Sequence, residues 1–447
     1  MTRALLTIAG VVALTYATRS FVPRGATITG SGAALAFGFL LICAIQAARV
    51  FEKLHLPHLT AYILVGLVFG PEVLGIISAR MLPDLALVKG TAVGLIAFLA
   101  GCELNLRRLA PRLRAISAVT LLSMVFSAVL LFALMYGVTF ILPIAKDFTT
   151  WQRVVVALAC ANVLAAYSPA VVIGLISETR AKGPLTEMVM SVVVIADLII
   201  VVTYAISSAL ARNAFPGGAA AGLGLLVPHI FGSILAGAIL GALLAVYARR
   251  VGLRSGMFTV AVLFVAAEAG AALHLNPLLV GLAAGLFLEN VSPVGGEALS
   301  RGAESVALPT FAIFFAVVGA EVHMKAFLHV APFAVAAAVL RAIGIFAGTR
   351  LAARVAGLDP LLARRVAVGL LPQAGVAIAL AALMLSDHKP WGSVFGTVIL
   401  GTIVVNQLVA PVLFKNAIVA AGEAHGHDDA EDTLTPSPTA APPHPVP

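Results

Sequence analysis

Apolar runs of membrane-spanning length recur along the whole sequence, and they constrain the fold more than any other feature. A run of about 18 or more residues with few charges is long enough to cross a bilayer as a helix. The chain is 61% hydrophobic and 11% charged, whereas soluble proteins are about half apolar and a quarter charged. A β-barrel would show short alternating segments instead. The sequence therefore predicts an all-α polytopic membrane protein.

The apolar runs define fourteen candidate segments, so we expect 13–14 transmembrane helices. The first segment could be a retained helix or a signal peptide. The tenth is short and could form a bent pair with the ninth. The segments lie near 4–22, 30–48, 58–77, 83–102, 115–142, 154–177, 185–211, 219–248, 256–273, 277–290, 306–322, 327–351, 366–386 and 391–419.

The basic residues predict the orientation in the membrane. Loops that follow even-numbered segments hold 17 Lys and Arg, and loops that follow odd-numbered segments hold 9. Because cytoplasmic loops are enriched in Lys and Arg, both termini are expected in the cytoplasm if the first segment is retained. The net charge of +8 is spread over these loops without a basic stripe, so no nucleic-acid partner is expected. We expect an integral protein of the bacterial inner membrane.

One carboxylate lies in the middle of an apolar segment. Asp197 is the only charged residue in VVVIADLIIVV (192–202). A charged side chain at the membrane centre costs about 2.5–3.5 kcal/mol on insertion scales, so it normally faces a cavity or a partner. Burial disfavours its charged form, and a bound cation or basic partner favours it. We therefore predict that Asp197 binds an ion and a proton alternately; a static salt bridge or a helix–helix hydrogen bond is the alternative.

Two further charged residues lie within apolar runs. Arg341, in FAVAAAVLRAIGIFAG, is the candidate partner of Asp197, since an arginine needs a counter-charge, carbonyls or water. It could hold the end of a broken helix or balance the site when no cation is bound; the alternative is an arginine that reaches the interface. Glu268, in LFVAAEAGAAL, is a secondary candidate.

Segments 6 and 13 carry helix-breaking and polar residues at mid-depth. Proline removes a backbone donor and frees a carbonyl, and such interruptions offer dipole ends and carbonyls to an ion. A kinked packing helix is the alternative. The expected breaks lie at Pro169, Pro372 and Gly375, and the expected neutral ligands or water-positioning groups are Asn162, Ser168 and Gln373.

The two broken segments suggest an internal repeat. Segments 2–7 (about 30–211) and 9–14 (about 256–419) form two sets of six, joined by a linker helix at 219–248. Equivalent segments of the two sets are seven segments apart. Because seven is an odd number, the second set crosses the membrane in the opposite direction. Such inverted repeats are a transporter architecture. We expect an extra N-terminal helix over 1–29, a membrane domain over 30–419, and a disordered cytoplasmic tail over 420–447, which is rich in Pro and acid.

Four motifs in a shared order resemble those of the monovalent cation/proton antiporter superfamily. LPHLTAYILVGLVFGP (56–71) is similar to an early helix of the family, and FLAGCELNLRRL (98–109) to its F-L-A-G-L-E-L-D-L stretch. FFAVVGAEVHM (314–324) and VAPVLFKNAI (409–418) resemble two later motifs. The resemblance implies a core domain with crossed broken helices, here segments 6 and 13, that moves against a dimerisation domain. It places the ion-binding aspartate at Asp197 and the core basic residue at Arg341, and it implies a homodimer.

The sequence also departs from the family pattern. Ala196 stands where many members have an acid or an amide before the aspartate, and Gln373 stands in a crossing helix that often reads P-R-G-E. The glutamine resembles the potassium-efflux branch, but that branch's soluble nucleotide-binding domain is not seen. A single carboxylate favours electroneutral 1:1 exchange.

These observations lead to a functional prediction. We expect a secondary antiporter that exchanges Na⁺ or K⁺ for H⁺ by alternating access. The alternatives are a proton- or cation-coupled carrier of an organic solute, and a non-transporting receptor or assembly subunit. No catalytic motif or zinc-like spacing occurs, so we expect no enzyme, no cofactor, and no metal beyond the transported cation.

Overall fold

The computed structural model describes residues 31–424 with short gaps, together with residues 7, 8, 10 and 12. The gaps fall at 55, 104, 216–222, 252–257, 259–260, 267–269, 271–272, 274, 294–295, 322–323, 375, 379, 382–383, 385–387 and 389–390. Over these described residues the regular structure is helical, without strands. The predicted all-α fold is confirmed.

Most of the predicted segments are helices in the structure. In the described part, seven helical stretches are long and apolar enough to cross a membrane, and four shorter apolar helices accompany them. These eleven occupy the predicted segments other than the first, ninth and thirteenth, which lie wholly or partly outside the described residues. The chain is therefore a polytopic membrane protein.

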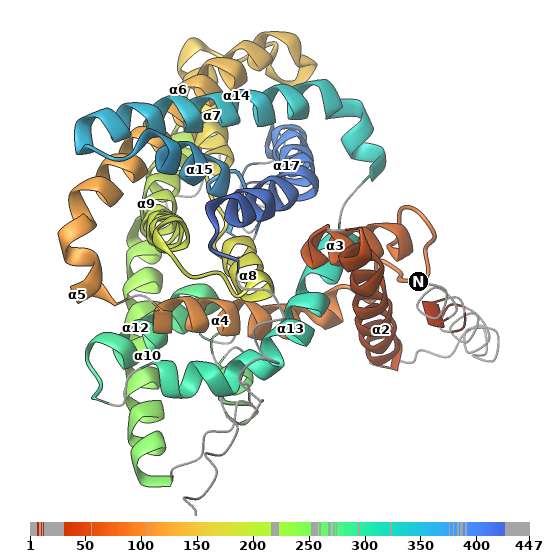
Figure 1. Cartoon of the computed structure of the whole chain (residues 1–447). Helices are drawn as coiled ribbons and strands as arrows, with labels where there is room; N and C mark the ends of the chain where they lie inside the picture. The colour runs from red at the N-terminus through yellow and green to blue at the C-terminus, as the bar shows by residue number, and fades with distance from the viewer. Residues whose placement is uncertain are drawn as a thin grey trace, which may run out of the picture.

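Figure 1 shows the arrangement of the described helices. Their bounds, in chain order, are α2 (Ser31–Lys53), α3 (His58–Phe69), α4 (Ala86–Glu103), α5 (Leu106–Leu109), α6 (Leu113–Ile141), α7 (Thr150–Leu164), α8 (Pro169–Thr179), α9 (Pro184–Ala214), α10 (Leu223–Val251), α12 (Pro277–Asn290), α13 (Glu297–Ala320), α14 (Met324–Ala356), α15 (Pro360–Gly369) and α17 (Trp391–Ala421).

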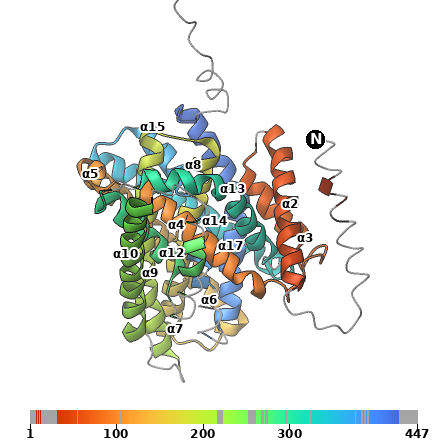
Figure 2. The same ribbon diagram turned by 90° about the horizontal axis from the view of Figure 1, so that it is seen from below.

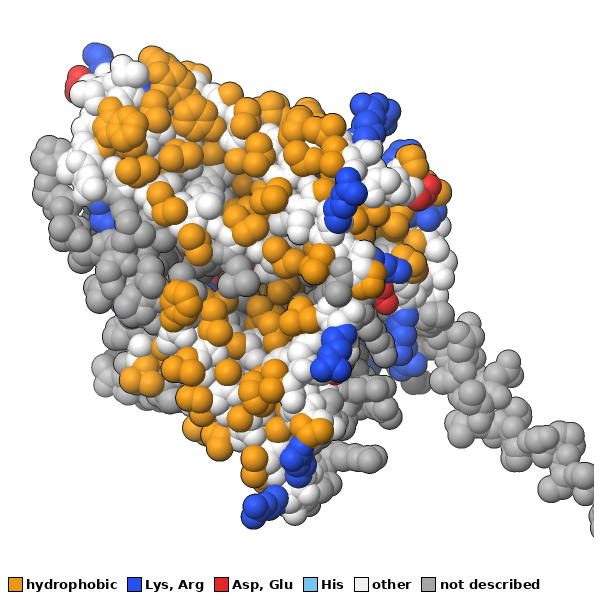
Figure 3. All heavy atoms as spheres, turned by 90° about the vertical axis from the view of Figure 1, so that its left-hand side faces the viewer, with side chains coloured by type: hydrophobic (Ala, Val, Ile, Leu, Met, Phe, Trp, Pro, Cys, Tyr) orange, Lys and Arg blue, Asp and Glu red, His pale blue; other side chains and the backbone are white. Residues whose placement is uncertain are grey.

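Burial separates central helices from peripheral ones. Helices α7 and α8 are almost entirely buried, whereas α10 leaves the large side chains of Phe231, Leu235 and Leu243 exposed. Helices α2 and α10 lie at opposite edges of the molecule (Figures 1 and 2). Apolar side chains cover much of the face in Figure 3, and Lys and Arg gather along one of its edges. This arrangement matches a surface that faces lipid and ends at a positively charged interface.

Small residues let helices from different parts of the chain cross closely. Helix α4 packs on α12, and α3 packs on α13. A methyl group at Gly281 would overlap the carbonyl of Gly94, and one at Gly319 would overlap the carbonyl of Ile63. Close backbone approach through small residues is a common way to join membrane helices. In the predicted repeats, α3 is the counterpart of α12, and α4 is the counterpart of α13. Each crossing therefore joins one of these helices of the first repeat to the counterpart of the other, so the two crossings are equivalent.

Some sequence predictions cannot be placed in this structure. Glu268, Gly375 and residues 425–447 lie outside the described residues, as does most of the predicted first helix. The predicted domain boundaries and the linker role of the helix at 219–248 remain predictions.

Candidate ion-binding site at two helix breaks

The first interruption separates α7 from α8. Helix α7 ends at Leu164, α8 begins at Pro169, and residues 165–168 are not part of a regular helix. The Ser168 hydroxyl accepts a hydrogen bond from the Val171 backbone N–H (3.3 Å) and caps α8. Proline fits the first position of a helix because its missing N–H has no partner there. Ser168 and Pro169 therefore start a new helix in the middle of the bundle.

The second interruption follows α15 and is bonded directly to the first. Helix α15 ends at Gly369, and residues 371–374, which include Pro372, are not helical. The Gln373 amide donates to the carbonyls of Val163 (3.3 Å) and Leu164 (3.0 Å) at the end of α7. Its oxygen accepts from Asn406 Nδ2 in α17 (2.8 Å). Gln373 thus joins both interruptions to α17.

Arg341 supplies the other bonds between the two interruptions. Its side chain is fully buried, and Nη2 donates to the carbonyls of Ala166 (2.7 Å) and Leu370 (3.2 Å) while Nη1 donates to that of Leu371 (2.7 Å). Of the roles considered for Arg341, this geometry matches the one that holds broken-helix ends. It does not match an arginine that reaches the interface.

An aromatic side chain completes the surroundings of this arginine. The guanidinium carbon of Arg341 lies 5.5 Å from the centroid of the Tyr167 ring, and the Tyr167 hydroxyl is 2.8 Å from the Ser123 hydroxyl of α6. Tyr167 was not among the residues predicted for the site. Its position directly before Ser168 and Pro169 was the available signal.

Asp197 lies on α9 at the depth of the first interruption. Helix α9 packs against α7 and α8. At about 1.5 Å per residue, Asp197 is roughly 20 Å from the start of α9, and Pro169 is roughly 15 Å from the end of α8. Because a short connection joins the end of α8 to the start of α9, the two residues lie at similar depths. Asp197 is also near the middle of the 31-residue helix α9.

The carboxylate of Asp197 is buried and unsatisfied. Its side chain is 2% exposed, and neither oxygen has a hydrogen-bond partner among the described residues. Arg341, the predicted partner, donates to carbonyls instead and makes no ion pair with Asp197. The prediction of that pair is wrong for this conformation, because the two interruptions leave carbonyls that take up the guanidinium donors.

The predicted neutral ligands are not hydrogen-bonded to Asp197. Asn162 accepts a bond from the Thr203 hydroxyl (2.8 Å) and donates to that of Ser207 (3.3 Å), both further along α9. Ser168 caps α8, and both ends of the Gln373 amide are engaged. A buried carboxylate without protein donors needs a proton or a bound cation. The ligand role of these three residues stays a prediction.

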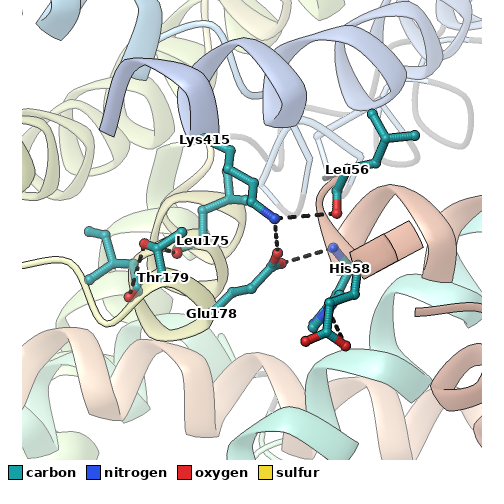
Figure 4. Close-up of polar contacts among 8 residues, drawn as sticks. Leu56, His58, Leu175, Glu178, Thr179 and Lys415 are labelled. Atoms are coloured by element: carbon teal, nitrogen blue, oxygen red, sulfur yellow. Dashed lines mark hydrogen bonds and ion pairs between the residues drawn. The ribbon is translucent and has the colours of Figure 1, made fainter. Parts of the chain in front are cut away.

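A second polar cluster joins α8 and α17 to the start of α3 (Figure 4). Lys415 Nζ donates to Glu178 Oε1 (2.9 Å) and to the Leu56 carbonyl (3.3 Å), and the His58 backbone N–H donates to Glu178 Oε2 (2.9 Å). The Glu178 side chain is only 5% exposed. This cluster was not predicted from the sequence, although Lys415 belongs to one of the four quoted motifs.

Two crossed helix interruptions beside a buried carboxylate define a transporter-type membrane bundle. A sequence profile of the family "Sodium/hydrogen exchanger, transmembrane" matches residues 37–419. The chain belongs to this family, so it is a cation/proton antiporter of the sodium/hydrogen exchanger type. No curated protein matches the chain in sequence.

Among the solved structures that share the fold are two of the sodium proton antiporter MjNhaP1 from Methanocaldococcus jannaschii. One, at pH 8, is 17% identical, covers 87% of this chain and 96% of that chain, and has a TM-score of 0.62. The other is 15% identical, covers 89% of this chain and 100% of that chain, and has a TM-score of 0.68.

Replacing Arg341 should test its role between the interruptions. We expect Arg341→Gln to destabilise the protein by about 3 kcal/mol or more, because buried carbonyls lose charge-assisted partners. Thermal unfolding in detergent measures the loss, with Arg250→Gln at the exposed end of α10 as the control. The double variant with Asp197→Asn should show additive effects. Strong coupling between the two substitutions would instead indicate that the two side chains form a pair.

Proposed function

We propose that Asp197 binds a monovalent cation and a proton alternately, and that this competition couples their transport. The observation that carries the proposal is a fully buried carboxylate, at mid-depth of the bundle, without a protein hydrogen bond from the described residues. A structural carboxylate would be paired or hydrogen-bonded. Na⁺ is the first ion to test, since both structural relatives carry the name of a sodium proton antiporter; K⁺ is the second.

The surrounding residues have supporting roles in this proposal. Arg341 and Gln373 hold the two interruptions together, so that the helix ends keep their positions when the cation leaves. Asn162 fixes α7 against α9, and Ser168 fixes the start of α8. In this way the four residues shape the space around Asp197, and water or helix-end carbonyls supply the remaining oxygen ligands that hard cations prefer.

Alternating access is part of the proposal. Helices α7, α8, α9, α15 and α17 form the moving body, and α2, α3, α4 and α13 belong to the body against which it moves. The protein works as a homodimer in the bacterial inner membrane, with its C-terminus in the cytoplasm. The cluster around Glu178 lies where the two bodies meet, and it stabilises one of the alternating states.

Proton movement in sealed proteoliposomes with an imposed pH gradient tests the role of Asp197. Na⁺, K⁺ and Li⁺ are added in turn. We expect Asp197→Asn to reduce cation-triggered proton flux at least a hundredfold, because the amide cannot exchange a proton for a cation. Glu187→Gln, an exposed acid on the same helix that pairs with Arg112, is the matched control and should change the flux less than twofold.

The outcome also separates the alternatives. Flux that persists in Asp197→Asn would refute the shared site. A folded wild-type protein that responds to no alkali cation would direct the search to an organic solute.

We propose the ratio of cations to protons from the presence of one acidic residue, Asp197. Ala196 leaves Asp197 as the one carboxylate at its level of α9, so we propose electroneutral 1:1 exchange. We expect the apparent cation affinity to fall by at most about tenfold per pH unit on acidification, the limit for one competing proton. Initial rates over a pH series measure this slope. A slope near a hundredfold, or a membrane potential generated by exchange, would contradict the 1:1 ratio.

Breaking the Glu178 cluster should shift the balance between the two states. Glu178→Gln removes the ion pair with Lys415, and we expect about a fivefold to tenfold change in state populations. The change is measured by hydrogen–deuterium exchange and by the transport rate. We expect faster exchange at residues 56–58 and 176–179 together with an altered transport rate.

The matched control for this cluster is an ion pair inside one body. Lys89→Gln removes the Lys89–Glu321 pair (2.8 Å) between α4 and α13, and we expect it to leave transport unchanged. Equal effects of Glu178→Gln and Lys89→Gln on transport would argue against a role of the Glu178 cluster in the conformational change.

A further inference from the structure

A cavity with basic and apolar walls lies between the end of α14 and the start of α15. Its volume is about 750 Å³, and three arginines, Arg350, Arg354 and Arg364, line it together with apolar side chains such as Phe346 and Leu361. Arg350 and Arg354 are one turn apart on α14, about 6 Å along its axis, and Arg364 comes from α15. The cavity is separate from the site at Asp197.

The three guanidinium groups are available to a ligand. None of them has a hydrogen bond or ion pair with a residue that the structure describes, and all three residues are exposed. The neighbouring Arg365 and Arg114 differ, since they donate to the carbonyls of Ala420 and Val355. Three positive charges therefore border one cavity without compensation from described groups.

The acid in this hairpin does not neutralise them. Asp359, in the connection from α14 to α15, accepts a hydrogen bond from the Leu362 N–H (2.7 Å) and caps α15. Its carboxylate serves the helix N-terminus, where negative charge is stabilised. The cavity keeps a net positive charge, which favours an anionic occupant.

The position in the membrane narrows the choice of anion. Lys and Arg gather along one edge of the apolar face in Figure 3, and α14 ends on the side that the charge distribution assigns to the cytoplasm. The cytoplasmic leaflet is the one rich in anionic lipid, and basic pockets between membrane helices suit such head groups. Phe346 lies one turn before Arg350 towards the membrane interior, and Leu361 is half exposed at the cavity. Phosphate-binding groups beside apolar walls match a phospholipid better than a soluble anion.

We infer that this cavity binds one anionic phospholipid of the cytoplasmic leaflet. The lipid phosphate lies among Arg350, Arg354 and Arg364, whose planar guanidinium groups bind phosphate oxygens in pairs. One acyl chain of this lipid packs along the side chains of Phe346 and Leu361. The inference does not depend on the proposed role of Asp197. It places a lipid on the hairpin whose helices carry Arg341 and lead into the second interruption.

Lipid-dependent stability of the full chain tests the inference. The purified protein in detergent is titrated with phosphatidylglycerol, with phosphatidylcholine of the same chains, and with inorganic phosphate, while thermal unfolding and native mass spectrometry are recorded. We expect phosphatidylglycerol alone to raise the Tm and to stay bound. In Arg350→Gln/Arg354→Gln/Arg364→Gln, we expect its apparent affinity to fall at least tenfold, since each basic residue at an anionic surface contributes roughly fivefold.

Two matched variants make the test specific. Arg107→Gln/Arg249→Gln/Arg250→Gln removes three exposed arginines from the same predicted side outside the cavity, and it should bind phosphatidylglycerol like the wild type. Leu361→Glu adds a negative charge at an exposed position of the cavity and should weaken binding with all arginines present. Equal losses in both triple variants would show general surface attraction and overturn the site. A Tm increase with inorganic phosphate equal to that with phosphatidylglycerol would overturn the lipid as ligand, and so would unchanged lipid binding in the cavity variant.

Discussion

The structure depends on how unpaired backbone carbonyls are satisfied in the interior of a membrane bundle. Two helices stop near mid-depth, and water is not freely available there to bind the groups that are released. Arg341 donates to the carbonyls of 166, 370 and 371, and Gln373 of the second interruption donates to those of 163 and 164 at the end of α7. The Val163 carbonyl also accepts from the Ala166 N–H, but without these donors the carbonyls of 164, 166, 370 and 371 would each carry a desolvation penalty of about 1–3 kcal/mol. The crossing is therefore held by polar bonds, and small residues allow the surrounding helices to pack closely.

Asp197 differs from the two residues that bond the interruptions together. Both Nη atoms of Arg341 donate to backbone carbonyls, whereas neither oxygen of the Asp197 carboxylate on α9 has a donor among the described residues. The chain belongs to the sodium/hydrogen exchanger family, and the proposed alternate binding of a cation and a proton at Asp197 would explain why this carboxylate has no protein donor. On this interpretation, the arginine stabilises the architecture so that the aspartate can remain available for transport.

Much of the fold could be predicted from the sequence. Long apolar runs and short polar connections located eleven of the fourteen segments, because a helix in lipid must bond its own backbone and therefore needs about 20 apolar residues in a row. Pro169 and Pro372 marked the two places where that rule fails. The four motifs pointed to the family that the profile match then established. These signals are local, so they can be read without knowledge of the tertiary structure.

The partners of the polar residues could not be read in the same way. The sequence suggested an Arg341–Asp197 pair, since both are isolated charges in apolar runs, but the carbonyls of the two interruptions take up the arginine. It also gave no indication that Glu178 would meet Lys415, 237 residues later, beside the start of α3. The sequence by itself determined the membrane class, the segments, the breaks and the buried acid. Only the tertiary structure decided which donor meets which acceptor, because hydrogen bonds act over about 3 Å and helix packing alone brings such distant residues that close.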